Sequence, residues 1–487
     1  MKATLFVSKS LVVSVLFTFY SAFADNSFTA PKGYSIETIS LPENTKMNIA
    51  GLDVASNGDV YAATRLGEVW VLKGGADISN TTPIWRRFAD GLHEVTGLLV
   101  DDDSIMVAQK PELTRLVDTN SDDIAEQYLR VVKGWKFHNN YHEYHYGPVK
   151  DNEGNYYAAL NLAHGGKTSL AMMGSDGGWR GWMYQVNTKG EFVPYASGLR
   201  SPAGIGISPS QELFFTDNQG DWIATSKLHY VEKGKFYGHP ASLIDHPDYS
   251  FDKVHNMTAG DFAALAEPPT VWFPHREVAN SPGNPVWDTT DGQFGPFAGQ
   301  MFIPDYTFSS IFRVMLDKVN GQYQGAAMNF MDGFQSGNIR IQFDDNGQLW
   351  VGQTARGWPT RGNKPFGLQK VVWNGEQAFE LQNIKLTRAG FSLTFTDTID
   401  ETSVVPDAFS IHQWRYRYSK EYGSPKLDEQ IIEVTDTVLS EDKKTINISL
   451  PLTPNRVLSI AFDGIAANSQ QTPSTTELFY TLNQVIH

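Results

Sequence analysis

An arginine and a loop rich in oxygen-bearing side chains lie close together in the segment 198–240 of this sequence. Arg200 occupies the turn GLRSPAG, directly before a predicted strand. An arginine at such a turn can hold a carboxylate, or a ligand rich in carbonyl groups, through two parallel hydrogen bonds. The alternative is a structural ion pair with Glu212 or Asp217. The sequence leaves both interpretations of Arg200 open.

Two loops present several oxygen atoms within a few residues, which is the pattern that calcium requires. The loops read Asp217-Asn218-Gln219-Gly220-Asp221 and Asp118-Thr119-Asn120-Ser121-Asp122-Asp123. In the first loop we predict Gly220 and Asp221 as calcium ligands. In the second we predict Asp118, Asn120 and Asp122. Turns closed by Asp and Asn side chains explain the same composition without a metal.

Histidines are concentrated in the run HNNYHEYHYGP, which begins at His138. In an extended strand, His138 and His142 face one side and His145 the other, unless the chain bends. A single histidine that acts as a general base would be His142 or His138. The alternatives are a metal site that combines the three histidines with Glu143, and histidines that are only structural.

These residues lie between segments that have the pattern of short antiparallel strands. Six similar units recur, each with a turn signal between apolar or alternating runs. The units span residues 51–72, 97–116, 147–186, 204–231, 299–316 and 339–372. Recurrence at several tens of residues is typical of a β-propeller. We therefore predict an all-β protein in which residues 25–375 form a six-bladed β-propeller that presents the candidate residues on one face.

The pattern changes after Asn374. Residues 385–395, 431–438, 445–450, 457–462 and 478–482 alternate as short strands between turns. This suits a small β-sandwich. We predict that residues 376–487 form this second domain and that it carries no concentrated chemistry. Helix signals are nearly absent, apart from a short turn near residues 261–265.

Composition limits the surroundings and partners of the protein. A basic start, the apolar stretch 11–19 and the run Ala22-Phe23-Ala24 predict a signal peptide over residues 1–24. We therefore expect a periplasmic or secreted protein without a membrane anchor, because no later run reaches about 18 apolar residues. A net charge of −15 disfavours nucleic acid as a partner. The lack of cysteine excludes disulfides, thiolate metal sites and covalently attached haem.

The runs GLRSPAGI, LFFTDNQGD and KLHYVEKGKFYGHP resemble the soluble quinoprotein glucose dehydrogenase and sorbosone dehydrogenase family. The resemblance implies a secreted six-bladed propeller that uses pyrroloquinoline quinone (PQQ) and calcium. It implies that Arg200 contacts the quinone, that residues 219–221 supply calcium ligands, and that a histidine before the turn YGPV is catalytic. Arg340, Arg356 and Lys364 would replace basic residues that the family places in its last blades. The implied cofactor contacts are Arg65, Arg200, Asn218, Gln219, Trp222, Arg340 and Arg356.

Three functions are compatible with these features. The first is an exported sugar or alcohol oxidoreductase, in which His142 or His138 takes a hydroxyl proton while hydride passes to the quinone and a separate acceptor receives the electrons. The second is a polysaccharide lyase in which Arg200 binds a uronate carboxylate. Its base would be His142 or His164, and its acid Tyr184. The third is a non-catalytic propeller that binds a small sugar or a glycan.

Overall fold

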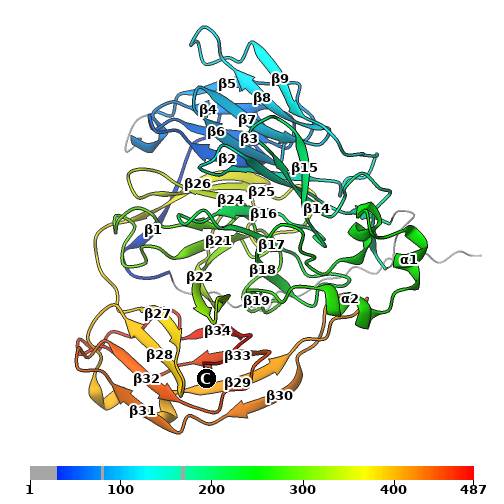
Figure 1. The fold of residues 1–487 in the computed structure, drawn as a ribbon. Coiled ribbons are helices and arrows are strands. Elements are labelled where there is room, and N and C mark those ends of the chain that lie inside the picture. Colours follow the sequence, from blue (N-terminus) through cyan, green and yellow to red (C-terminus); the bar gives the residue numbers. More distant parts are fainter. Residues whose placement is uncertain (1–29, 78–81, 166–170, 487) are drawn as a thin grey trace, which may run out of the picture.

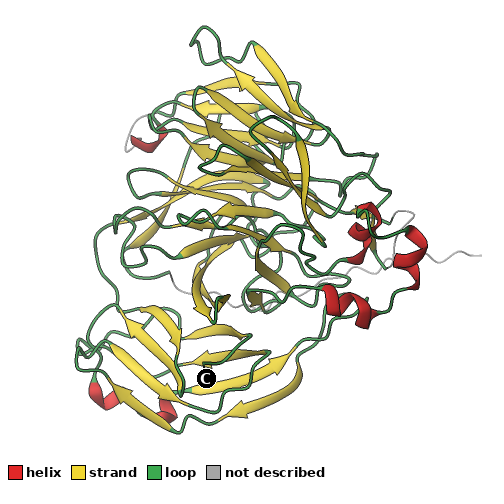
Figure 2. Ribbon diagram, in the orientation of Figure 1, coloured by secondary structure: helices red, strands yellow, loops and turns green. Residues whose placement is uncertain are grey.

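Almost all regular structure in this protein is β-strand (Figure 2). The computed structural model describes residues 30–77, 82–165 and 171–486. The predicted signal peptide lies outside these residues. Two α-helices occur in the described chain, α1 (Phe251–Asn256) and α2 (Ala259–Leu265). Thr258 and Asp261 form a capping box that starts α2, because each side chain accepts a backbone N–H of the other residue.

Short 3-10 turns occur at Gly75–Asp77, Pro240–Asp245, Glu401–Ser403 and Pro406–Ala408. Among the residues that the structure describes, no helix is long and apolar enough to cross a membrane. The helical turn predicted near residues 261–265 is part of α2.

Five sheets of four antiparallel strands, and four further strands that begin an eight-stranded sheet, make six units of four strands. The first unit is β2 (Ile49–Val54), β3 (Val60–Thr64), β4 (Val69–Leu72) and β5 (Trp85–Ala89), and the second is β6 (Gly97–Asp101), β7 (Ser104–Gln109), β8 (Glu112–Val117) and β9 (Gln127–Val132). The third is β10 (His145–Lys150), β11 (Tyr156–Leu160), β14 (Trp182–Val186) and β15 (Phe192–Ser197), and the fourth is β16 (Gly204–Ile207), β17 (Leu213–Asp217), β18 (Ser226–Tyr230) and β19 (Val271–Phe273). The fifth is β20 (Val286–Trp287), β21 (Met301–Asp305), β22 (Ser310–Val319) and β23 (Gln322–Met331), and the sixth is β24 (Asn338–Phe343), β25 (Leu349–Thr354) and β26 (Phe366–Trp373) with β1 (Tyr34–Thr38). A small extra sheet pairs β12 (Ala163–His164) with β13 (Met173–Gly174). Each of the six units seen in the sequence falls within one of these units, and the prediction of an all-β, antiparallel protein is confirmed.

Most first strands of successive units contact one another. β2 contacts β6, β6 contacts β10, β10 contacts β16, and β24 contacts both β21 and β2. Glycine permits these close approaches, since a Cβ on Gly97 would lie 1.6 Å from the carbonyl oxygen of Gly147. β1 pairs with β26 and so joins the start of the described chain to the sixth unit. The loops at one end of these inner strands therefore gather around a common centre.

The C-terminal strands continue the fifth unit. β34 pairs with β23, where Ala326 lies opposite Tyr480, and the result is one sheet in the order β20-β21-β22-β23-β34-β33-β29-β30. A second sheet has the order β27-β28-β32-β31. The strands are β27 (Leu381–Leu386), β28 (Gly390–Phe395), β29 (Ser410–Arg415), β30 (Leu427–Ile432), β31 (Asp436–Leu439), β32 (Thr445–Ser449), β33 (Arg456–Ala461) and β34 (Glu477–Leu482).

Figure 1 shows these orange and red strands at one end of the molecule, beneath β22. Their hydrophobic core also contains Met315 of β22 and Met328 of β23. A shared sheet and a shared core hold the C-terminal strands firmly against the fifth unit, because separating them would expose apolar side chains to water.

Candidate functional site

A cavity of about 480 Å³ opens at the centre, where the loops of the six units meet. Its volume is in the range of small-molecule sites. Its wall consists of Ala50, Arg65, Thr96, Tyr141, His142, Tyr144, Tyr146, His164, Met172, Arg200, Ser201, Ala203, Asn218, Gln219, His275, Asn280, Ser281, Tyr306, Thr307, Ile339, Thr354, Arg356, Gly357, Trp358 and Tyr422. The structure thus brings together six predicted site residues: Arg65, His142, Arg200, Asn218, Gln219 and Arg356.

The wall of this cavity is basic although the protein is acidic. Three arginines and three histidines belong to it, and none of the described aspartates or glutamates does. The whole chain carries 54 acidic against 39 basic residues. Positive charge that converges on a concave surface attracts anions, because the low-dielectric wall focuses the field. The cavity is therefore suited to a ligand with negative charge.

Arg200 is held at the wall by the loop that follows β17. Its Nε donates to Oδ1 of Asp221 at 2.9 Å. The guanidinium lies against Gly220, where a Cβ would be 2.0 Å from Cζ of the arginine. Asp217 accepts from the backbone N–H of Arg200 instead, at 2.9 Å. The structural ion pair of Arg200 is therefore with Asp221, and not with the predicted Glu212 or Asp217.

The carboxylate of Asp221 is bonded by four donors. Besides Arg200, these are the backbone N–H groups of Met172 (3.0 Å) and Met173 (2.8 Å) and Nε2 of His239 (3.2 Å). Nδ1 of His239 accepts a backbone N–H, so Nε2 carries the proton and donates. Burial alone would raise the pKa of Asp221, but the hydrogen bond from His239 and the charge of Arg200 hold this pKa well below its usual value.

The first predicted calcium loop does not fit the ion. The carbonyl oxygen of Gly220 accepts from the N–H groups of Ile223 (3.1 Å) and Gly423 (2.9 Å). Asp221 already binds its four donors, so both predicted ligands have their oxygens engaged within the protein. The glycine at position 220 is explained by the guanidinium of Arg200 that lies on it.

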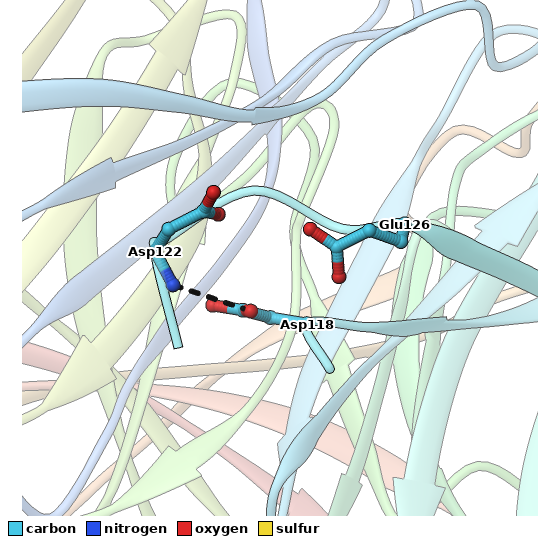
Figure 3. Close-up of side chains that lie close together, drawn as sticks. All are labelled: Asp118, Asp122 and Glu126. Carbon is cyan, nitrogen blue, oxygen red and sulfur yellow. Dashed lines mark hydrogen bonds between the residues drawn. The ribbon is translucent and has the colours of Figure 1, made fainter. Parts of the chain in front are cut away.

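The second predicted calcium loop lies outside the cavity wall. Asp118 accepts from the backbone N–H groups of residues 120–123, and the bond from Asp122 is drawn in Figure 3. The Oδ1 of Asn120 accepts from the N–H of Asp122 at 3.0 Å. Asp118, Asp122 and Glu126 place one carboxylate oxygen each within 4.8 Å of the others (Figure 3). The loop is thus a turn closed by its own side chains, with a cluster of carboxylates at its surface.

His142 lines the cavity and is oriented by Asn161. The Nδ2 of Asn161 donates to Nδ1 of His142 at 3.0 Å and to its carbonyl oxygen at 2.6 Å. These bonds assign the ring proton to Nε2, because Nδ1 accepts. Burial, with the neighbouring His164 and Arg200, lowers the pKa of His142 to about 3. At neutral pH the ring is uncharged, offers an N–H donor, and is a weak proton acceptor.

The other histidines of the run lie elsewhere. His138 stays outside the wall, with Nδ1 3.0 Å from Oε1 of Glu143. His145 is buried between a backbone oxygen at 2.8 Å and the hydroxyl of Tyr184 at 2.7 Å, and burial lowers its pKa to about 3. The three histidines therefore do not gather around a metal. Tyr184, the acid of the lyase hypothesis, lies in the core rather than at the cavity.

Two further arginines meet at the wall. Arg65 forms an ion pair with Glu94 at 2.7 Å and also donates to the hydroxyl of Tyr144 and to the carbonyl oxygen of Arg356. The side chain of Arg356 is exposed and makes no ion pair with the described residues. The charge of Arg65 is thus balanced by Glu94, whereas Arg356 is available to a ligand.

Arg340 and Trp222 are not part of the wall. Arg340 is buried and donates to the carbonyl oxygens of Thr96 (2.6 Å) and Ala203 (2.7 Å), which are wall residues. It lies behind the wall and borders a second cavity of about 440 Å³. Trp222 is buried against Phe262. Arg340 therefore supports the wall from behind, and neither side chain lines it.

The wall contains buried polar atoms without a partner among the described residues, and two of the residues that carry them were not singled out by the sequence. Oδ1 of Asn218, Oδ1 of Asn280 and Nδ1 of His275 are buried without a hydrogen-bond partner in the described chain. Buried polar atoms of this kind are normally satisfied, so these three are candidates to bind ligand hydroxyls. Asn218 was predicted as a cofactor contact. His275 and Asn280 lie in a loop between β19 and β20 whose sequence carries no recognisable motif.

Similarity to known proteins agrees with this architecture. Residues 84–294 match a family described as a domain of unknown function (DUF7133), and no curated protein matches the sequence. A putative oxidoreductase (glucose dehydrogenase) from Thermus thermophilus is 15% identical, with a TM-score of 0.51 over 70% of this chain and 100% of that one. The PQQ-bound aldose sugar dehydrogenase from Streptomyces coelicolor is 13% identical, with a TM-score of 0.50 over 71% and 99%.

A calcium structure of Trichoderma reesei carbohydrate-active enzymes family AA12 is 12% identical, with a TM-score of 0.51 over 71% of this chain and 97% of that one. Over about 70% of its length, the chain shares its fold with these proteins. The resemblance seen in the sequence is thereby confirmed for the fold, and these identities are too low to transfer the role of any residue.

Proposed function

We propose that this protein is an oxidoreductase that acts on a sugar or alcohol in the central cavity, with PQQ as the hydride acceptor. The basic wall, without a described carboxylate, is the observation that carries this proposal. PQQ is a tricarboxylate, and its burial requires cations. Among the described residues, Arg356 supplies an unpaired charge, and Arg65 and Arg200, which are paired with Glu94 and Asp221, add guanidinium groups to the wall. The fold shared with sugar dehydrogenases supports the same proposal.

The residues of the wall divide the chemistry between them. When bound, PQQ accepts a hydride from the carbon that bears the reacting hydroxyl. The Nε2–H of His142 would donate a hydrogen bond to a ligand oxygen. His164, whose ring centre lies 4.8 Å from that of His142, would receive the hydroxyl proton. In this proposal His138 has no part, and the electrons leave to a separate acceptor.

Calcium is not included in the cavity. The oxygens of Gly220 and Asp221 are engaged by protein donors, so the predicted site there does not fit the ion. The prediction for Asp118, Asn120 and Asp122 stays a prediction about a surface loop. No step of the proposed reaction passes through that loop.

Binding of PQQ is the direct test. The protein is titrated with PQQ while tryptophan fluorescence is followed, and dye reduction is then measured with aldoses and alcohols. Arg356→Ala should weaken PQQ binding about tenfold or more, because a charge-assisted hydrogen bond is lost. Arg130→Ala removes an exposed arginine outside the wall and should change nothing. A protein that binds no PQQ overturns the proposal.

Polysaccharide lyase activity is the second candidate, and the same basic wall favours it. Arg356 and Arg200 suit a uronate carboxylate, and Tyr144, bonded to Arg65, is a tyrosine of the wall. An acidic glycan such as polygalacturonate would then yield an unsaturated product that absorbs in the ultraviolet, without PQQ. Sugar binding with neither activity would identify a non-catalytic carbohydrate-binding protein.

We also propose the finer architecture and location. The six units would be the blades of one closed propeller over residues 25–375, which the pairing of β1 with β26 supports. Residues 376–487 would form a β-sandwich, supported by the core between their two sheets. A signal peptide over residues 1–24 would direct the protein to the periplasm or the exterior. N-terminal sequencing of the protein recovered from those fractions tests the cleavage after residue 24.

A further inference from the structure

The C-terminal region reaches the central cavity through one loop. The loop 416–426 connects β29 to β30 and packs against the loop that follows β17. The N–H of Gly423 donates to the carbonyl oxygen of Gly220 at 2.9 Å, and two further backbone hydrogen bonds join the same loops. The C-terminal region is thereby attached to the segment that positions Arg200.

Tyr422 in this loop covers Arg200. The Cζ of Arg200 lies 5.4 Å from the centre of the tyrosine ring, which is a cation–π contact. Tyr422 is nevertheless 56% exposed and belongs to the cavity wall. Much of its ring is therefore turned toward the mouth of the cavity rather than packed in a core.

Two more exposed aromatic rings stand on the same wall. Trp358 is 55% exposed and Tyr141 is 51% exposed. They come from the loop after β25 and the loop before β10, so three separate elements each supply one ring. Large apolar side chains that remain exposed around a single cavity mark a binding surface, since their exposure to water is otherwise unfavourable.

We propose that Tyr141, Trp358 and Tyr422 bind sugar units of an oligosaccharide at the mouth of the cavity. The substrate is then the end of a glycan chain of two or more units, and not a free monosaccharide. The apolar C–H face of a sugar ring packs on an aromatic face, while its hydroxyls stay in water. Rings that are half exposed contact what protrudes from the cavity, whereas the unit inside meets His142 and the arginines. This inference rests on the proposed function.

The test measures the affinity of the full chain for glucose, cellotetraose and maltotetraose by calorimetry. At least one tetrasaccharide should bind about tenfold more tightly than glucose, the effect of one or two stacked rings. Tyr422→Ala and Trp358→Ala should each lower the ratio of tetrasaccharide to glucose affinity, and Tyr422→Phe, which keeps the ring, should preserve it. Tyr128→Ala removes an exposed tyrosine outside the wall and is the matched control.

Equal affinity for glucose and both tetrasaccharides overturns the inference, as does binding of none of the three. An unchanged ratio in both Tyr422→Ala and Trp358→Ala overturns it as well. Because these two residues lie on different loops, misfolding of one variant leaves the other to decide. PQQ binding, measured separately, shows whether the oxidoreductase proposal fails together with the inference or survives it.

Discussion

The two aspartate-rich loops of this protein are alike in sequence and different in environment. In the loop 217–221, Asp217 and Asp221 are buried and bind Arg200 and backbone groups of other segments. In the loop 118–123, Asp118 binds only N–H groups of its own turn. A run of Asp, Asn and Gly thus predicts carboxylates that require a positive partner or hydrogen-bond donors. It does not reveal whether the donor is a metal, a distant arginine or the loop itself.

Asp221→Ala should have the largest effect, because it leaves Arg200, His239 and two backbone N–H groups without their partner. Loss of one member of a buried ion pair costs about 3–5 kcal/mol in the free energy of unfolding. Urea denaturation measures this cost, and PQQ affinity should fall with it. The matched change Asp118→Ala should cost about 1 kcal/mol or less. Equal losses in the two variants would contradict the contrast between the loops.

Gly220→Ala should be the next largest change, because its Cβ would lie 2.0 Å from Cζ of Arg200. The arginine must move, so PQQ affinity should drop, and overpacking should cost about 1–3 kcal/mol of stability. Gly260→Ala in α2 meets only an ordinary contact of 3.6 Å and is the control. A Gly220→Ala variant with normal PQQ affinity would show that PQQ binding does not depend on the position of Arg200.

Mild acid should lower the free energy of unfolding through the buried histidines, at a higher pH than the one at which Asp118 and Asp221 of the two loops become protonated. Burial lowers the pKa of His142 and His145 to about 3. Below pH ~6.5 these two side chains are therefore protonated in the unfolded state but not in the folded state. Stability then falls as the pH drops from about 6.5 to 4.5, by on the order of 2 kcal/mol per histidine. Burial raises the pKa of Asp53 to about 6, which opposes this loss.

Denaturation curves at several pH values measure this slope. His145→Asn should flatten the slope. The carboxylates of Asp118 and Asp221 have lowered pKa values, so their contribution is lost only at lower pH. An unaltered slope in His145→Asn would show that the buried histidine is not the cause.

Calcium should give the smallest effect and only at the surface loop. The carboxylates of Asp118, Asp122 and Glu126 repel one another, and a divalent ion relieves this repulsion. A calcium titration should raise the melting temperature slightly in the wild type and not in Asp118→Ala. A rise that persists in Asp118→Ala would place calcium elsewhere, and the absence of any rise would contradict the predicted site.

The sequence predicted the parts of the site that depend on neighbouring residues. Arg200 was identified from its turn, His142 from the run of histidines and Arg65 from the family resemblance, and all three line the cavity. Contacts between segments far apart in the sequence were not predicted correctly. Tyr184 carries no sign in its strand that its hydroxyl bonds His145 in the core. Tyr422 lies in a region judged to be without chemistry, because nothing local shows that β34 pairs with β23 and carries the C-terminal strands to the cavity.

By itself, the sequence determined the six repeated units and their turns, because alternation of apolar residues and turn chemistry act within a few positions. In the C-terminal region the predicted strands were less accurate: 385–395 and 431–438 each span parts of two strands, and β29 was not predicted. Only the tertiary structure decided the partners of the functional side chains. Asp221 forms an ion pair with Arg200. This is possible because β16 pairs with β17, so that the turn before β16 lies beside the loop after β17. The cavity exists because the six units meet at a centre, where loops far apart in the chain place three arginines together.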